Sequence, residues 1–225
     1  MKHNILQKAL AVGIIAVTSS YASAASFTFT EAAGFEIGDV DVAYYGAAKA
    51  APAPAGVSGE MYWYDDPATP DSELRLVNPA ADTAIAANSW ETITTLYHEN
   101  NTISALVPAT QGWSGQDILG RLIIKDGGVT VFDNVDPITI DLTETTNANC
   151  VPANPTGSPL PCDDFFTFTS IGLDPVTFTD ALGIEWEASF RLFNFVSSAP
   201  VGDDTVYTAE GVTSSLDVQM MLTQV

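Results

Sequence analysis

The sequence predicts an all-β protein, an antiparallel β-sandwich of jelly-roll or immunoglobulin-like topology. Short runs of alternating apolar and polar side chains, the pattern of a strand, make up most of the chain after its first 24 residues. Clusters of Gly, Pro, Asn and Asp separate these runs, and no segment shows the 3.6-residue period of a helix. About 200 residues follow the leader, which is the size of one β-domain.

Residues 1–24 have the three parts of a signal peptide. Lys2 and Lys8 supply the basic region, residues 9–17 form the apolar core, and Ala22-Ser23-Ala24 is the expected cleavage triplet. This core is shorter than the roughly 20 apolar residues that span a bilayer. We therefore expect residues 25–225 to form one domain without an integral membrane segment, secreted or held at the cell surface of a bacterium.

The predicted mature region is strongly acidic. With the two leader lysines removed, five of the seven basic residues remain against 28 acidic ones, a net charge of −23. Such a field repels nucleic acid and attracts divalent cations or basic partners, and it also keeps an exported protein soluble. The charge therefore excludes nucleic acid as the expected partner.

Several runs are predicted as individual strands. A hairpin is expected where the turn Lys125–Gly128 joins residues 118–124 to residues 129–132. Residues 184–192 give the clearest alternation, and its parity changes after Leu192, which predicts a bulge there. The other expected strands are residues 26–30, 61–64, 74–77 and 216–222.

The strand expected from Trp90 to Tyr97 runs into four polar residues, His98, Glu99, Asn100 and Asn101. Such side chains favour local hydrogen bonds, so we predict a polar turn at this point. His98 is the only histidine after the leader, and we expect it and Asn100 to bond backbone groups at a strand corner.

Cys150 and Cys162 are the only two cysteines, and an even count in an exported chain predicts one disulfide. The intervening segment is rich in proline and has no hydrophobic period. Closing this loop is expected to contribute about 3 kcal/mol.

Five segments resemble, in order, those of the THxN-motif family of exported bacterial proteins, many of which end in a PEP-CTERM sorting tail. They are Trp63–Pro67 with Ser72 and Leu74, Tyr97–Asn101, Glu144–Asn147, Cys162–Phe165 and Tyr207–Gly211. Tyr97 stands where the naming motif has threonine, and no sorting tail precedes Val225. The resemblance implies an envelope or extracellular-matrix setting without an assigned activity, and the missing tail implies release or assembly outside the cell.

The sequence does not favour catalysis. No serine lies in a nucleophile elbow to pair with His98, and Gln111–Gly115 lacks the required glycine spacing. Glu185 and Glu187 are about 7 Å apart on one face of the expected strand, but alternating acids are the ordinary outer face of a half-buried strand. We therefore predict a protein that is not an enzyme.

Calcium is the one cofactor that the sequence suggests, because it takes oxygen ligands from acidic loops. Asp163 and Asp164 follow the expected disulfide, which would hold them in place, and Asp65 and Asp66 form a second acidic pair. None of these acids has EF-hand spacing.

Two functions fit these features. The first is a non-enzymatic extracellular or biofilm-matrix protein that acts by self-association or surface adhesion, with Ser26, Phe27, Thr28, Phe29 and Thr30 as an assembly strand that adds to a neighbouring sheet edge. The alternative is a calcium-dependent carbohydrate-binding module that holds extracellular polysaccharide on aromatic side chains. This alternative requires that at least one of Tyr62, Trp63, Trp90 and Trp113 is exposed.

Overall fold

The fold is entirely β among the residues that the computed structural model describes, and its strands pair antiparallel. The described residues are 26–39, 43–47, 53–63, 72–101, 112–143, 145, 155–157, 162–170, 173–202 and 204–225. The strands are β1 (Phe27–Glu36), β2 (Ala43–Ala47), β3 (Val57–Trp63), β4 (Ser72–Val77), β5 (Thr83–Ile85), β6 (Trp90–Asn100), β7 (Trp113–Asp126), β8 (Val129–Thr143), β9 (Asp164–Ser170), β10 (Val176–Thr179), β11 (Glu185–Val196), β12 (Ser198–Val201), β13 (Thr205–Thr208) and β14 (Val212–Gln224). The predicted all-β, antiparallel class is confirmed.

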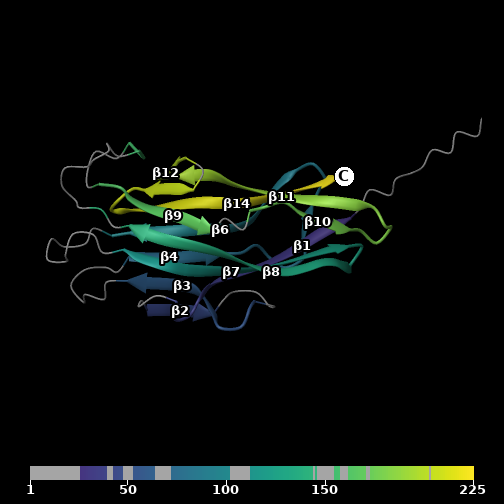
Figure 1. Ribbon diagram of the computed structural model, residues 1–225, viewed down its shortest axis with the longest axis horizontal. Helices are drawn as coiled ribbons and strands as arrows, with labels where there is room; N and C mark the ends of the chain where they lie inside the picture. Colours follow the sequence, from purple (N-terminus) through teal and green to yellow (C-terminus); the bar gives the residue numbers. More distant parts are fainter. Residues whose placement is uncertain are drawn as a thin grey trace, which may run out of the picture.

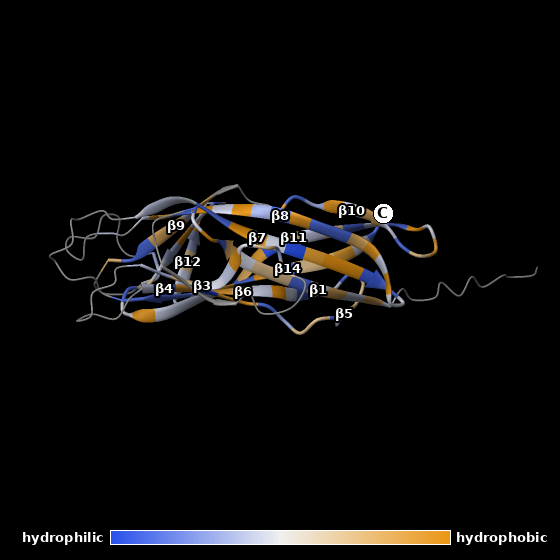
Figure 2. Ribbon diagram, turned by 90° about the horizontal axis from the view of Figure 1, so that it is seen from below, coloured by the Kyte–Doolittle hydropathy of each residue, from blue (hydrophilic) through white to orange (hydrophobic). Residues whose placement is uncertain are grey.

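The strands form one continuous sheet instead of the two separate sheets of the predicted sandwich. Its order is β10-β11-β14-β6-β4-β3-β1-β7-β8-β9-β13-β12, with β2 paired to β3 and β5 paired to β1. β1 joins the two halves because it pairs with β7 along one edge and with β3 and β5 along the other. The sheet curls about the long axis of the molecule, and its apolar side chains meet inside (Figures 1 and 2).

The predicted assembly strand, Ser26–Thr30, lies almost wholly in β1, in the middle of this sheet. Phe27 and Phe29 are buried in the core, and residues 27–35 pair with residues 118–126 of β7. The segment after β4 covers the outer face of β1, where Asn78 Nδ2 donates to Ala33 O and Asp82 N donates to Thr30 Oγ1. In this structure the strand therefore pairs within its own chain.

The predicted hairpin is confirmed. Asp126 of β7 pairs with Val129 of β8, and only Gly127 and Gly128 lie between them. Both glycines have positive φ, 56° and 86°, as a two-residue hairpin turn of the primed type requires.

The last strand and the parity change in β11 also follow the sequence pattern. Leu216, Val218, Met220 and Leu222 all face the core. The register between β11 and β14 shifts between Phe193 and Val196, and Asn194 has a φ of 53°. A bulge therefore lies just beyond the predicted position.

The chain passes directly from β11 into β12, which is at the opposite end of the sheet order. Ser214 Oγ donates to Ser197 O, and Ser198 Oγ donates to Ser215 O, so β12 is held beside β14 (Figure 1). This contact brings β9 and β13 over the end of β6 that carries His98.

The prediction of a polar turn at His98–Asn101 is wrong, because β6 continues to Asn100. His98 is aligned with Leu74 of β4 and with Ser214 of β14. Pairing along both edges of β6 outweighs the local preference of these side chains for a turn.

Two further predictions lie outside the described residues. The signal peptide, residues 1–24, is one, and Cys150 is the other; Cys162 is buried, and no described cysteine is free. The disulfide therefore stays a prediction. Within the described ranges, no helix is long and apolar enough to cross a membrane.

Candidate functional site

His98 is buried in an aromatic cage at one end of the curled sheet. The Trp63 ring stacks on the imidazole at 5.5 Å between centroids, and Phe166 meets it edge-on at 4.9 Å. His98 Nδ1 lies 2.9 Å from Thr208 Oγ1, and the tautomer decides which atom donates. Burial lowers the pKa of His98 to about 3, so the ring is neutral at physiological pH.

Asn100 ties the same strand to the segment after β13. Its Nδ2 donates to Thr208 O at 3.4 Å, and Gly211 N donates to Asn100 O at 2.6 Å. Thr208 Oγ1 in turn lies 3.4 Å from Asp164 O, to which it can donate. We call His98, Asn100, Trp63, Phe166 and Thr208 the His98 cluster; four of its members come from three of the segments that carry the family resemblance, and Phe166 directly follows a fourth.

The polar groups of the His98 cluster are largely occupied by one another. Within the described part of the chain, His98 Nε2 and Asn100 Oδ1 have no hydrogen-bond partner. The adjoining cavity is about 10 Å³, which is at the lower limit for one water molecule. A neutral, enclosed histidine with so little space beside it fits a structural role better than catalysis or metal binding.

The two predicted calcium ligands that the structure describes, Asp163 and Asp164, bond protein groups. Asp163 accepts hydrogen bonds from Thr156 N and Oγ1, and Asp164 Oδ1 accepts one from Thr145 N at 2.6 Å. Both acids are buried and hold neighbouring loop residues in place. Asp65 and Asp66 lie outside the described residues, so calcium binding stays a prediction.

A different acidic group, not predicted from the sequence, gathers where β1 ends beside β7. Carboxylate oxygens of Glu36, Asp39 and Asp117 lie within 4.8 Å of one another. Asp117 N donates to Asp39 Oδ2, and Thr139 Oγ1 donates to Asp117 Oδ1. Protein hydrogen bonds are therefore sufficient to explain the positions of Asp39 and Asp117.

None of the four aromatic residues considered for polysaccharide binding is fully exposed. Trp63 is buried in the His98 cluster, and Tyr62, Trp90 and Trp113 are half-buried. The Arg191 guanidinium covers the Trp90 ring at 4.1 Å, and Tyr62 Oη donates to Glu60. These residues therefore form no open platform for sugar rings.

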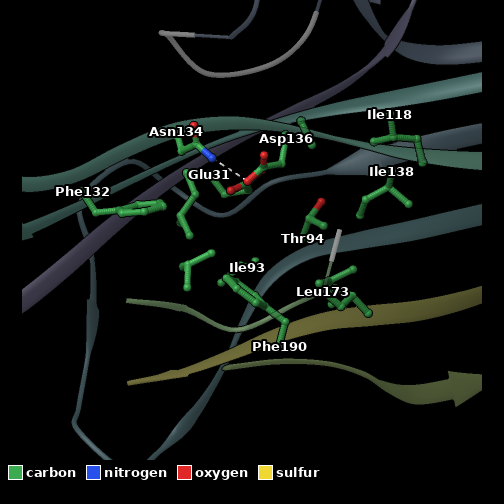
Figure 3. Close-up of a pocket in the computed structure, with 15 residues that line it drawn as sticks. Glu31, Ile93, Thr94, Ile118, Phe132, Asn134, Asp136, Ile138, Leu173 and Phe190 are labelled. Atoms are coloured by element: carbon green, nitrogen blue, oxygen red, sulfur yellow. Dashed lines mark hydrogen bonds between the residues drawn. The ribbon is translucent and has the colours of Figure 1, made fainter. Parts of the chain in front are cut away.

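A second enclosed site lies in the middle of the curled sheet, on the core side of β1, β7 and β8 (Figure 3). It is a cavity of about 80 Å³ with mainly apolar walls, and Glu31 of β1 is part of its lining. Glu31 is 5% exposed, whereas Asn134 and Asp136 of β8 are exposed where the cavity meets solvent. We call this cavity the Glu31 pocket.

The Glu31 carboxyl has no hydrogen bond or ion pair with any described residue. Burial alone raises its pKa to about 8, so the acid is mostly protonated at neutral pH. Gly120 of β7 makes room for it, because a Cβ there would lie 2.9 Å from Glu31 Oε1. The sequence carried a signal for this site: Glu31 shares the parity of Phe27 and Phe29, which face the core.

Comparison with known proteins adds no assignment. No protein-family model matches the chain, and no curated protein matches it. The geometry of these sites therefore carries the functional argument.

Proposed function

We propose that the chain is a non-enzymatic, exported extracellular or biofilm-matrix protein that acts by self-association or surface adhesion. The observation that carries the proposal is a strand at the end of the sheet whose outer edge is not hydrogen-bonded to another described strand. β10 pairs with β11 along one edge, and no other described strand pairs with its outer edge. An uncovered edge offers backbone N–H and C=O groups to a strand of another molecule.

The side chains of β10 favour such pairing. Its sequence, Val176-Thr177-Phe178-Thr179, contains only β-branched and aromatic residues and has no charge or proline. Thr177 and Thr179 are exposed, whereas Phe178 is anchored in the core. β10 therefore combines a fixed backbone with an uncharged outer edge.

Two of the other edges carry features that block pairing. β12, at the opposite end of the sheet, contains Pro200, which has no N–H to donate. The first part of β8 is unpaired on the side away from β7, but it carries Asp133, Asp136 and Pro137. Charge and proline are the usual protection of a sheet edge, so β10 is favoured over β12 and β8 as the contact.

The acidic charge of the chain makes association dependent on ions. Copies with a net charge near −21 repel one another in dilute salt, and this repulsion is screened over roughly 8 Å at physiological ionic strength. Calcium would strengthen association further if exposed acids of neighbouring copies shared the ion. We therefore expect larger particles in salt or calcium than in a chelator at low ionic strength.

The test compares particle size for the exported chain and for Thr177→Lys/Thr179→Lys. Two lysines on the edge should prevent strand addition while the fold is retained, as judged by circular dichroism. The matched control is Thr213→Lys, which adds a lysine at an exposed threonine of β14, in the middle of the sheet order. Light scattering and negative-stain microscopy should show large particles for wild type and control and monomers for the double variant.

A wild-type chain that stays monomeric in calcium, in salt and in chelator would overturn the assembly proposal. Particles that survive the two lysines would move the contact away from β10. Affinity for polysaccharide that disappears in chelator would instead favour the calcium-dependent carbohydrate-binding module.

A further inference from the structure

We propose that the Glu31 pocket binds a small cationic amphiphile, a hydrocarbon chain that carries one amine. The chain would lie among the apolar side chains of the core, and the ammonium group would contact Glu31 and Asp136. This proposal does not rest on the assembly proposal, although the pocket lies beside the β10 edge and Val176 of β10 lines it.

The first reason is that the pocket opens where the sheet does not close. β9 pairs with β8 only from Thr139 onward, and β10 is not hydrogen-bonded to β8. Phe132 and Ile138 of β8 and Val176 of β10 line the cavity between these two strands. A ligand therefore has an entrance that does not require any strand pairing to break.

The second reason is the state of Glu31. A buried carboxyl without a hydrogen-bond partner is unfavourable, and natural proteins rarely keep one without a use for it. Figure 3 shows Glu31 beside Asp136 at one edge of the cavity, where Asn134 Nδ2 donates to Asp136 Oδ2 at 2.6 Å. The two carboxyls form the polar end of a pocket whose other walls are mainly apolar.

The third reason is charge. Among the described residues, Glu31 and Asp136 are the only carboxylic acids that line the cavity, and β6, β7, β10, β11 and β14 contribute only uncharged side chains to it. Arg121, on β7, forms its ion pair with Asp133 and does not line the pocket. The lining thus complements a cation and disfavours a fatty acid or another anion.

The fourth reason is the shape of the interior. A second cavity of about 30 Å³ shares Thr94, Ile118, Ile138, Leu173 and Val218 with the first. Its other walls include Leu76, Leu192 and Phe168, all apolar. The two cavities therefore adjoin in the core, and this arrangement suits an unbranched chain with its head at Glu31.

Binding of an ammonium group should be linked to release of a proton. The empty pocket keeps Glu31 mostly protonated at neutral pH, because burial raises its pKa to about 8. A cation beside the carboxyl favours the ionised form, so affinity should increase from pH 6 to pH 8. Asp136 is the only other titratable group that lines the pocket in the described part of the chain.

The test measures binding of n-octylammonium to the exported chain by titration calorimetry, with n-octanol and n-octanoate as probes of the same length. We expect octylammonium to bind one per chain and at least tenfold more tightly than either probe. Each methylene added to the amine should increase its affinity about fourfold until the Glu31 pocket and the adjoining cavity are filled.

Two variants test the position of the binding site, and a third is their control. Glu31→Gln keeps the shape of the side chain and should weaken octylammonium binding at least tenfold and remove its pH dependence. Asp136→Asn should weaken binding severalfold. Asp133→Asn, on the opposite face of β8, is the matched control and should leave the affinity unchanged.

The proposal is overturned if octylammonium fails to bind the folded wild-type chain, or if Glu31→Gln binds it equally well. If octanol bound more tightly than octylammonium, the pocket would prefer a neutral ligand. If octanoate bound more tightly than octylammonium, the pocket would prefer an anion. Either result would contradict the proposed cationic ligand. Assembly measured on the same samples separates this result from the β10 proposal, because neither Glu31 nor Asp136 lies on that edge.

Discussion

The His98 cluster and the Glu31 pocket each bury one titratable side chain, but their surroundings differ. His98 is packed between Trp63, which stacks on it, and Phe166, which meets it edge-on. Its Nδ1 has Thr208 as partner, its Nε2 has none among the described residues, and the space beside it is about 10 Å³. Glu31 has no partner among the described residues and faces a cavity of about 80 Å³. Burial, a shifted pKa and an unpartnered polar atom are thus common to both sites, and the space beside the side chain is what marks the Glu31 pocket as the binding site.

The two side chains have opposite effects on how folding stability depends on pH. Burial disfavours the charged form in both cases, which lowers the pKa of His98 and raises that of Glu31. As pH falls from about 6.5 to about 3, the unfolded state takes up a proton that folded His98 does not, so stability falls. As pH rises from about 4.5 to about 8, the unfolded state loses a proton that folded Glu31 keeps, so stability also falls.

The largest expected effect is the contribution of Glu31 to the pH dependence of folding stability. The free energy of unfolding of the wild type should fall by up to about 5 kcal/mol between pH 4.5 and pH 8, since each unit of pKa shift is worth about 1.4 kcal/mol. We expect Glu31→Gln not to show this fall. Urea unfolding of wild type and variant at several pH values measures the difference. Parallel curves for the two proteins would show that Glu31 titrates normally.

The next effect contrasts packing at the two sites. Phe166→Ala should cost about 3–5 kcal/mol, because this side chain is fully packed against His98 and Trp113. Phe190→Ala should cost less, since Phe190 is only half-buried and already lines the Glu31 pocket. Thermal or urea unfolding at constant pH ranks the two variants, and an equal or reversed order would contradict the contrast.

A smaller effect tests the hydrogen bond to His98. Thr208→Val keeps the shape of the side chain and leaves His98 Nδ1 without its partner, which should cost about 1–3 kcal/mol. Thr205→Val is the matched control in the same strand, because its hydroxyl bonds only the exposed Asp204. Equal stability of the two variants would mean that the bond from Thr208 to His98 contributes nothing.

The sequence predicted local features well and long-range pairing poorly. Alternation located the last strand, and Gly127-Gly128 fixed the hairpin, because each depends on neighbouring residues only. The sandwich prediction was wrong because β1 joins both halves of the sheet, and the turn at His98 was wrong because β4 and β14 hold β6 straight. The pairing of β1 with both halves and the pairing of β6 with β4 and β14 join distant segments, so no short sequence pattern predicts them.

The Glu31 pocket was missed for a related reason. Glu31 occupies a core-facing position of an otherwise apolar strand, and that parity was the one available signal. Asp136 approaches it from β8, more than a hundred residues later, and only the curled sheet brings the two together. By contrast, three of the five segments that suggested the family resemblance meet at the His98 cluster.

The most direct test of the contrast between the two sites is a carbon-13 NMR titration of the Glu31 carboxyl and the His98 ring in one sample, with and without n-octylammonium. We predict a Glu31 pKa near 8 that falls when the amine is added, while the pKa of His98 stays near 3. A Glu31 pKa near 4.5, or one that octylammonium leaves unchanged, would contradict the assignment of the Glu31 pocket as the binding site.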